Sequence, residues 1–266
     1  MTNQASRFIG SIPEHYDRFL GPHIFHAFAD DLAARVAAQK PGSVLELAAG
    51  TGIVTRRLRD LLPAECTLTA TDLNPPMLEM ARSKFQAEEN VCFEPADAMA
   101  LPHGDSGFDV VTCQFGVMFF PDKRRSYEEA FRVLKPGGRY ILNVWGPWAS
   151  NPFAQIAHDT VTEFFPDDPP GFYKVPFSYH EAAAIESAIS QAGFSQVIIE
   201  SLEIRSEIPS AMDFATGLVF GNPLFEEVTS RDGDPQEVCS AVAKAIADKL
   251  GTSMPLQAMV IEAHKD

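Results

Sequence analysis

The stretch VLELAAGTG at residues 44–52 decides the fold, because an apolar run ends there in a glycine-rich turn. The apolar residues before the turn read as a buried β-strand, and a helical pattern follows it. Gly50 and Gly52 allow backbone N–H groups to approach a ligand closely, with Thr51 between them at the start of the helix. A strand, a turn and a helix in this order are typical of folds that bind a nucleoside-containing cofactor.

Around this stretch, short apolar runs alternate with helical patterns, which predicts βαβ units and a parallel sheet. We therefore expect an α/β fold with a doubly wound, mostly parallel sheet. The predicted strands are 43–48, 67–72, 91–97, 108–114, 139–145 and 194–204, and a last run at 255–263 is able to close the sheet. Apolar spacing predicts one helix face with Val54, Leu58, Leu61 and Leu62, and another with Tyr127, Ala130, Phe131 and Leu134.

The regular pattern lapses in two places, and the chain is predicted to be a single domain with helical lid insertions. Residues 1–40 are expected to form an N-terminal helical arm, and residues 41–145 a cofactor-binding core. The irregular stretches 146–178 and 205–250 are rich in Phe, Pro and Met. We expect them to cover the carboxyl ends of the strands, where open α/β sheets bind ligands, and to decide the substrate.

Composition and charge exclude several classes of function. The formal net charge of −15 over 266 residues disfavours nucleic acid as a partner, and Lys123-Arg124-Arg125 reads as the solvated start of a helix. The four cysteines lack C-x-x-C spacing, so neither a metal site nor a disulfide framework is predicted. With no apolar signal core and no stretch able to span a bilayer, we expect a cytoplasmic protein without membrane insertion.

The acidic residues near the turn distinguish two kinds of cofactor. A dinucleotide fingerprint would have a third glycine where this chain has Thr55, which disfavours NAD. Glu46 offers a carboxylate to a cationic ligand, and S-adenosylmethionine carries an ammonium and a sulfonium. Asp72 ends the second strand, where its two oxygens can accept both ribose hydroxyls, a role common to both cofactors.

The order of the motifs resembles that of Rossmann-like, seven-stranded S-adenosylmethionine-dependent methyltransferases, of the type found in ubiquinone and menaquinone biosynthesis. The motifs are LELAAGTG, Asp72 in TATDLNPPML, Asp97 in EPADAMALP, and VLKPGGRYIL at 133–142. The resemblance covers roughly residues 40–145. It implies S-adenosyl-L-methionine as the cofactor.

The resemblance also implies roles for individual residues. Glu46, Ala48, Gly50, Thr51 and Gly52 would line the methionine end of the cofactor, and Asp72 and Leu73 would hold the ribose. Asp97 would accept from the adenine amino group, with the Ala98 backbone beside the ring and Met77 packed against it. Gln114 or Phe115 would lie near the transferring methyl group, and the run 115–120 would lie at the substrate entrance.

Methyl transfer is an in-line displacement, so alignment is the chief demand and a general base is optional. His15 and Tyr16 are candidates for such a base, because PEHYDRFLGP (13–22) resembles the arm that folds over the cofactor in related enzymes. The alternative for His15 is an ordinary surface histidine. His23 and His26 share a helix face but have no further ligand nearby, so no metal site is predicted.

The sequence thus predicts methyl transfer from S-adenosylmethionine to a small, apolar or aromatic organic acceptor. Two alternatives stay open: a non-catalytic protein that binds S-adenosylmethionine, and an NAD-dependent reductase. The reductase is disfavoured because a third loop glycine and a Tyr-x-x-x-Lys pair are both missing. The expected partner is the small-molecule substrate, and a homodimer is left open, as is the acceptor atom.

Overall fold

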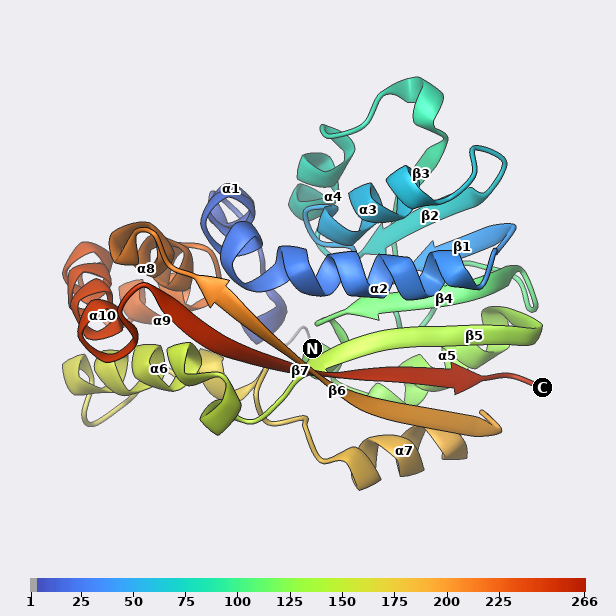
Figure 1. Ribbon diagram of the computed structural model, residues 1–266. Helices are drawn as coiled ribbons and strands as arrows, with labels where there is room; N and C mark the ends of the chain where they lie inside the picture. Colours follow the sequence, from blue (N-terminus) through green and yellow to red (C-terminus); the bar gives the residue numbers. More distant parts are fainter. Residues whose placement is uncertain (1–3) are drawn as a thin grey trace.

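The computed structural model describes residues 4–266 and contains one seven-stranded sheet with the strand order β3-β2-β1-β4-β5-β7-β6 (Figure 1). Its first five strands pair in parallel, and β7 runs antiparallel between β5 and β6. The predicted doubly wound, mostly parallel α/β fold is therefore confirmed. The strands are β1 (Ser43–Glu46), β2 (Thr67–Asp72), β3 (Val91–Pro95), β4 (Phe108–Gln114), β5 (Leu134–Trp145), β6 (Gln196–Glu207) and β7 (Ser253–His264).

Helices cover both faces of the sheet. In Figure 1, α2 (His26–Ala38) and α3 (Ile53–Leu61) lie in front of it, while α5 (Lys123–Val133) lies behind it and packs against α7 (Ala182–Gln191). The remaining helix of the core, α4 (Pro75–Arg82), follows β2 and contacts β2 and β3. Right-handed crossovers between parallel strands produce this two-sided arrangement.

The helix after the glycine-rich turn differs from the prediction at one position. Val54 and Leu58 are buried as expected, but Leu61 is 52% exposed, so its predicted place in the core is wrong. The helix ends at Leu61, and the next residue, Leu62, is extended and turns its side chain inward instead. Arg59 is also buried, because its guanidinium donates to three backbone carbonyls beyond the end of the helix.

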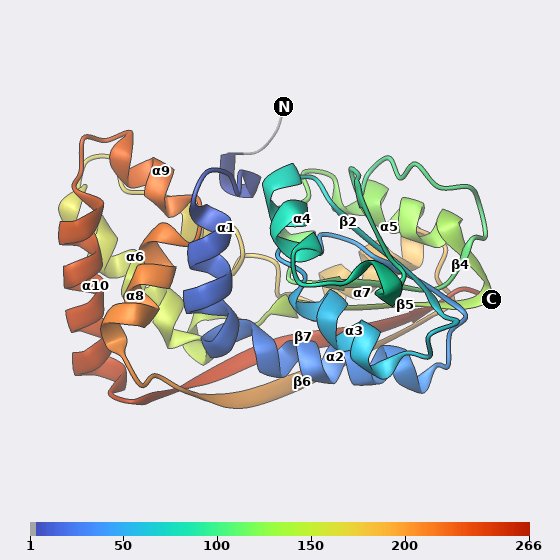
Figure 2. The same ribbon diagram turned by 90° about the horizontal axis from the view of Figure 1, so that it is seen from above.

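A cap of helices lies beyond the carboxyl ends of the parallel strands (Figures 1 and 2). It contains α6 (Pro152–Phe164), α8 (Ala211–Phe220), α9 (Leu224–Thr229), α10 (Pro235–Leu250) and, from the N-terminal arm, α1 (Ile12–His15) and the π-helix η2 (Tyr16–Phe25). The helix α8 contacts both α10 and η2. Arm and cap therefore meet over the edge of the sheet where ligands bind in open α/β folds.

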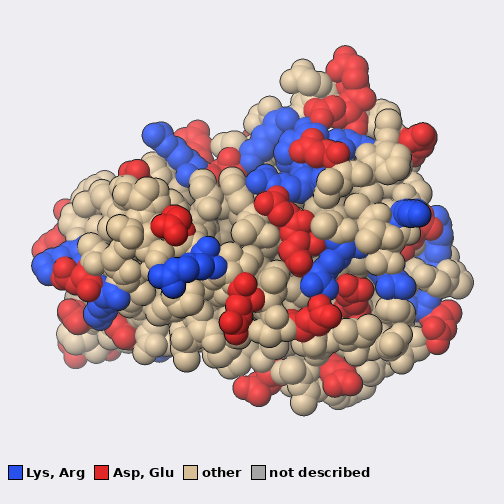
Figure 3. Space-filling view, in the orientation of Figure 1, with Lys and Arg blue, Asp and Glu red and all other residues tan. Residues whose placement is uncertain are grey.

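Basic side chains gather over α3 on the face shown in Figure 3, with acidic side chains among them. Arg56 pairs with Asp60 and Glu89, and Arg57 pairs with Asp30. The basic charge of this helix is thus matched by neighbouring acids.

No helix within residues 4–266 has both the length and the apolar character needed to cross a bilayer. In the same part of the chain, no three His, Cys, Asp or Glu side chains are grouped so that they could hold a metal ion.

Candidate active site

A cavity of about 250 Å³ lies where β1, β2 and β4 end, under the N-terminal arm. A smaller cavity of about 30 Å³ adjoins it at the glycine-rich turn. Of the predicted cofactor residues, the larger cavity is lined by Ala48, Gly50, Asp72, Leu73, Met77, Asp97, Ala98, Gln114 and Phe115, and the smaller one by Glu46, Ala48, Gly50, Thr51 and Gln114. The structure thus brings together residues from four separate stretches of the chain, 46–51, 72–77, 97–98 and 114–115.

Gly52 is the predicted cofactor residue that neither cavity includes. It has a left-handed backbone (φ +79°), and a Cβ atom added there would lie 2.9 Å from the Cβ of Ala81 on α4. A glycine is therefore needed at this position so that the start of α3 can pack against α4.

Asp72 links the glycine-rich turn to the end of β2. Its Oδ2 accepts a hydrogen bond from the Gly50 backbone N–H at 2.9 Å, and its Oδ1 accepts from the Asn74 backbone N–H at 2.8 Å. Burial raises the pKa of the Asp72 carboxyl, and these backbone donors oppose that effect. Asn74 Nδ2 also donates to Oδ1, at 3.2 Å. Because a carboxylate oxygen can accept two hydrogen bonds, Oδ2 is the oxygen that keeps capacity for a hydroxyl of a ligand.

Glu46 is buried at the end of β1, and Thr55 on α3 donates its hydroxyl hydrogen bond to Glu46 Oε2 at 2.6 Å. Burial raises the pKa of Glu46 to about 8, and repulsion from Asp72 adds to the increase. Thr55, which stands where a dinucleotide fingerprint has its third glycine, therefore holds the Glu46 carboxyl in place. The sequence pattern did not reveal this role. A cation in the small cavity would favour the ionised form of this carboxyl.

Two residues beside the cavity have left-handed backbones although they are not glycines: Ala48 (φ +52°) and Phe115 (φ +49°). Asn143 on β5 stabilises the backbone conformation of Phe115, because its Oδ1 accepts from the Phe115 backbone N–H at 3.0 Å. Its Nδ2 also donates to Gln114 Oε1 at 3.3 Å. Backbone strain of this kind persists where the surrounding structure enforces it, and it clusters at functional sites.

The N-terminal arm closes one side of the cavity, and Tyr16 lines all three cavities of the site, including the aromatic one described below. Its ring stacks on Phe25 with centroids 4.7 Å apart. Burial, together with repulsion from Asp72 and Asp17, raises the pKa of Tyr16 far above its usual range. Its phenol is therefore neutral, so at neutral pH it can donate a hydrogen bond but cannot remove a proton.

One acid of the arm, Asp17, connects it to two elements around the cavity. Its Oδ1 accepts from Thr51 Oγ1 at 2.7 Å and also pairs with Lys84, which follows α4. A second attachment joins the Phe8 backbone N–H to Asn74 Oδ1 at 3.3 Å. The arm is thus fastened across the cavity rather than lying loosely over it.

His15, the other predicted base, is not among the residues that line any of these cavities. Its imidazole lies between the rings of Phe19 and Phe220, and its Nδ1 contacts the Ser11 carbonyl at 2.9 Å. His15 therefore packs against aromatic rings outside these cavities, and its predicted role as a base stays a prediction.

An aromatic cavity of about 60 Å³ opens beside the larger one and extends toward the cap. The described residues that line it include no charged side chain; they are Phe8, Tyr16, Leu20, Ile24, Phe25, Phe115, Phe119, Trp145, Phe153, Phe172, Tyr173, Pro176, Phe177, Leu218 and Asn222. Phe8, Tyr16, Phe115 and Phe119 line the larger cavity too, so the two spaces share a wall.

Some residues of the run 115–120 lie in the core and others line the site. Val117 and Met118 are buried in the core, whereas Phe115, Phe119 and Phe120 line the larger cavity. Phe115 stacks on Trp145 with centroids 3.9 Å apart and an interplanar angle of 6°. Sequence alone could not identify which aromatic rings face the ligand.

The strand order, the cavity at the carboxyl ends of β1, β2 and β4, and the acids at the ends of β1 and β2 define a Rossmann-like methyltransferase fold. Residues 7–161 match the model of the ubiE/COQ5 methyltransferase family, and the chain belongs to that family. The predicted resemblance to S-adenosylmethionine-dependent methyltransferases of this type is thereby confirmed.

Two curated relatives come from bacterial quinone biosynthesis. The demethylmenaquinone methyltransferase of Deinococcus radiodurans is 37% identical over 156 residues, which are 57% of this chain and 64% of the relative. The ubiquinone/menaquinone biosynthesis C-methyltransferase UbiE of Shewanella frigidimarina is 36% identical over 121 residues, 44% of this chain and 48% of that protein. The chain therefore matches less than two-thirds of the length of these relatives.

Solved structures share the fold at low identity. The YcgJ protein of Bacillus subtilis has a TM-score of 0.58 and 21% identity, and the match covers 90% of this chain and 99% of that one. The phosphoethanolamine N-methyltransferase 2 of Haemonchus contortus, in complex with S-adenosyl-L-methionine, has a TM-score of 0.62 and 17% identity over 95% of this chain and 56% of its own. At such identities the likeness concerns the fold alone.

Proposed function

We propose that this protein transfers a methyl group from S-adenosylmethionine to a small, uncharged, aromatic or apolar acceptor. The observation that carries the proposal is the shared wall between two different cavities. One has the acids Asp72 and Asp97, with Glu46 in the small cavity that adjoins it, and the other is lined mostly by aromatic rings. A polar nucleoside and an apolar acceptor could therefore sit side by side, which converts a bimolecular reaction into an aligned one.

The polar side chains of the larger cavity and of the small cavity beside it fit this cofactor. Asp72 Oδ2 has a lone pair free for a ribose hydroxyl, and Asp97 would accept from the adenine amino group. Glu46 and Gln114 line the small cavity, where the charged methionine end would lie. When bound, the cofactor supplies an electrophilic methyl group on a sulfonium.

The acceptor is inferred from the aromatic cavity. A charged acceptor would lose its hydration there without gaining a charged partner, which is costly. A flat aromatic ring would instead pack against the aromatic side chains that line this cavity and bury apolar surface. Because two relatives are named for quinone biosynthesis, a substituted quinol is the first acceptor to test.

Loss of the acceptor's proton on methylation depends on the acidity of the acceptor more than on a base of the protein. Tyr16 is a neutral phenol, so it would orient an acceptor oxygen by donating a hydrogen bond. The described residues that line the aromatic cavity include no acid and no histidine. This favours an acceptor with an acidic hydroxyl that would give up its proton to water as the bond to the methyl group forms and the bond from the methyl group to sulfur breaks, because such an acceptor needs no strong base.

The test is transfer of a radiolabelled methyl group from S-adenosylmethionine to a panel of quinols, phenols and amines. We expect transfer to uncharged aromatic acceptors, and its loss in Asp72→Ala. A heat-stability shift with S-adenosylmethionine but no transfer to any acceptor would favour the non-catalytic binding protein. Failure of the wild-type protein to bind either S-adenosylmethionine or S-adenosylhomocysteine would refute the proposal.

A further inference from the structure

The segment 96–106, between β3 and β4, carries Asp97, Ala98 and Met99 to the cofactor cavity without forming a regular strand or helix. A tight turn shapes its start: Asp97 Oδ1 accepts from the Met99 backbone N–H at 2.9 Å, and the Asp97 carbonyl accepts from the Ala100 N–H. Beyond this turn, the segment has no neighbouring strand to bind its backbone groups. Such groups need partners from elsewhere.

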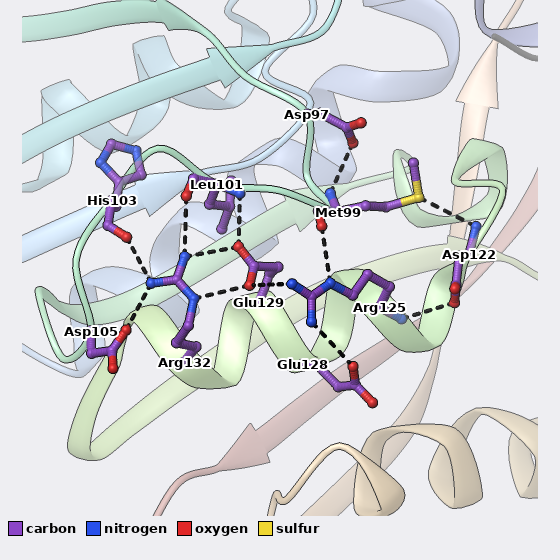
Figure 4. A network of polar contacts seen from close by, with 10 residues as sticks. All are labelled: Asp97, Met99, Leu101, His103, Asp105, Asp122, Arg125, Glu128, Glu129 and Arg132. Atoms are coloured by element: carbon purple, nitrogen blue, oxygen red, sulfur yellow. Dashed lines mark hydrogen bonds and ion pairs between the residues drawn. The ribbon is translucent and has the colours of Figure 1, made fainter. Parts of the chain in front are cut away.

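Three side chains of α5 supply these partners, as Figure 4 shows. Arg125 Nε donates to the Met99 carbonyl at 3.2 Å. Glu129 Oε2 accepts from the Leu101 N–H at 2.8 Å. Arg132 donates to the carbonyls of Leu101 and His103 at 3.1 and 2.7 Å.

Glu129 is the centre of this group, because both arginines bind its carboxylate. Arg132 donates to both of its oxygens, at 2.9 and 2.8 Å, and Arg125 lies 3.3 Å from Oε1. Its side chain is 4% exposed, whereas the side chains of the two arginines are 30% and 52% exposed. The hydrogen bonds from Arg132 hold the pKa of Glu129 below its usual range, so the buried side chain carries a full negative charge.

A carboxylate suits this position and an amide does not. Every group that contacts Glu129 is a donor: two guanidinium groups and one backbone N–H. The carboxylate is acceptor-only and can meet all of them. An amide would place its own N–H groups against these donors and lose two charge-assisted bonds, which are the stronger kind.

We propose that Glu129 is a positioning residue that, together with Arg125 and Arg132, fixes the Asp97–Met99 turn and thereby sets recognition of the adenine ring. The proposal rests on the proposed function, since it concerns the same cofactor. Glu129 does not line the cavity and acts on the ligand through the backbone of the segment. If the segment shifts, the Asp97 carboxylate no longer faces the adenine amino group.

The test compares the affinities of two ligands by calorimetry: S-adenosylhomocysteine and S-inosylhomocysteine. The second carries a carbonyl in place of the amino group, so Asp97 would lose a donor and face an acceptor. We expect the wild-type protein to prefer the adenosyl ligand by about 10- to 100-fold, the cost of leaving a charged acceptor unpaired. In Glu129→Gln we expect that preference to fall about threefold or more, with the KM for the cofactor rising and kcat nearly unchanged.

Glu128→Gln is the matched control, since it removes the same charge one residue earlier on the same helix. The contacts of Glu128 go to Arg124 and Arg125 at the surface, and we expect its ligand preference to equal that of the wild type. Arg125→Gln is the second test variant: this half-exposed side chain contributes little to folding but binds the Met99 carbonyl. It should lower the preference even if Glu129→Gln does not fold.

The outcomes separate this inference from the proposed function. If the wild-type protein binds the adenosyl ligand and both Glu129→Gln and Arg125→Gln keep its full preference, the positioning role is refuted and the methyltransferase proposal stands. If Glu129→Gln is unfolded, Arg125→Gln decides alone by the same criterion. If the wild-type protein binds neither ligand, the proposed function itself is wrong.

Discussion

The raised pKa of Glu46 predicts how stability changes with pH in the protein without cofactor. Glu46 is buried, and its pKa increases from an ordinary 4.5 to about 8 on folding. A carboxyl with a raised pKa stabilises the folded state fully below the pKa of the unfolded chain. As pH rises from 4.5 to about 8, the unfolded chain releases the proton first, and that stability is lost.

The magnitude follows from the width of this window. Between these two pKa values, each rise of one pH unit lowers the free energy of unfolding by about 1.4 kcal/mol. Between about pH 5 and pH 7 the loss from Glu46 alone is on the order of 2–3 kcal/mol. Glu46→Gln removes this titration and keeps an oxygen that can accept from the Thr55 hydroxyl. The variant should therefore gain stability relative to the wild type as pH rises.

The measurement is urea unfolding of both proteins, without cofactor, at about pH 5, 6, 7 and 8. Groups that do not interact with Glu46 contribute equally to both proteins, so the difference in the free energy of unfolding reports Glu46 and its coupling to Asp72. We expect the difference to grow by about 2–3 kcal/mol from pH 5 to 7 and to level off above pH 8. A difference that stays flat across this range would show that Glu46 is already ionised in the folded protein, and the reasoning would be wrong.

Three further predictions concern the cavity and its surroundings. Asp72→Ala should abolish binding of S-adenosylhomocysteine in calorimetry, because it removes the ribose acceptor and the carboxylate that binds the Gly50 backbone N–H; retained binding within about threefold would contradict that role. Gly116→Ala should cost about 1–3 kcal/mol in urea unfolding, because its Cβ would lie 2.6 Å from the Cβ of Ala48, whereas Gly171→Ala, with open space around it, should cost much less. Asp17→Ala should release S-adenosylhomocysteine about tenfold faster in stopped-flow measurements, because the arm loses its bonds to Thr51 and Lys84; an unchanged rate would mean that the arm does not limit exit.

The sequence was sufficient for features that depend on local pattern. Alternating apolar runs located all seven strands to within a few residues, apart from β5, which begins five residues earlier than predicted at Leu134. The glycine-rich turn identified the cavity, because carboxyl ends of parallel strands meet at one edge and acids placed there converge. Asp72 and Asp97, separated by a whole βα unit in sequence, line the same cavity for that reason.

Other features depend on contacts between distant parts of the chain, which no local pattern encodes. Asn143 lies in a predicted buried strand, and only the pairing of β4 with β5 places it beside Phe115. Its one visible signal is a polar residue inside the apolar run RYILNVW. Glu129 reads as a surface residue of an amphipathic helix, yet folding buries it against Leu101. His15 is a candidate because residues 13–22 resemble an arm over the cofactor, but its imidazole packs on Phe19 and Phe220 and is not among the residues that line the cavity.

The place where the two cavities meet follows from the backbone at the ends of two adjacent strands. β1 and β4 are neighbours in the sheet, and each continues into a left-handed residue, Ala48 after one and Phe115 after the other. Gly116 has no side chain, which lets these two chain reversals approach each other closely. The Phe115 ring stacks on Trp145, the last residue of β5. That ring then serves as a wall of both cavities, so the strain at Ala48 and Phe115 determines where a cofactor and an acceptor would meet.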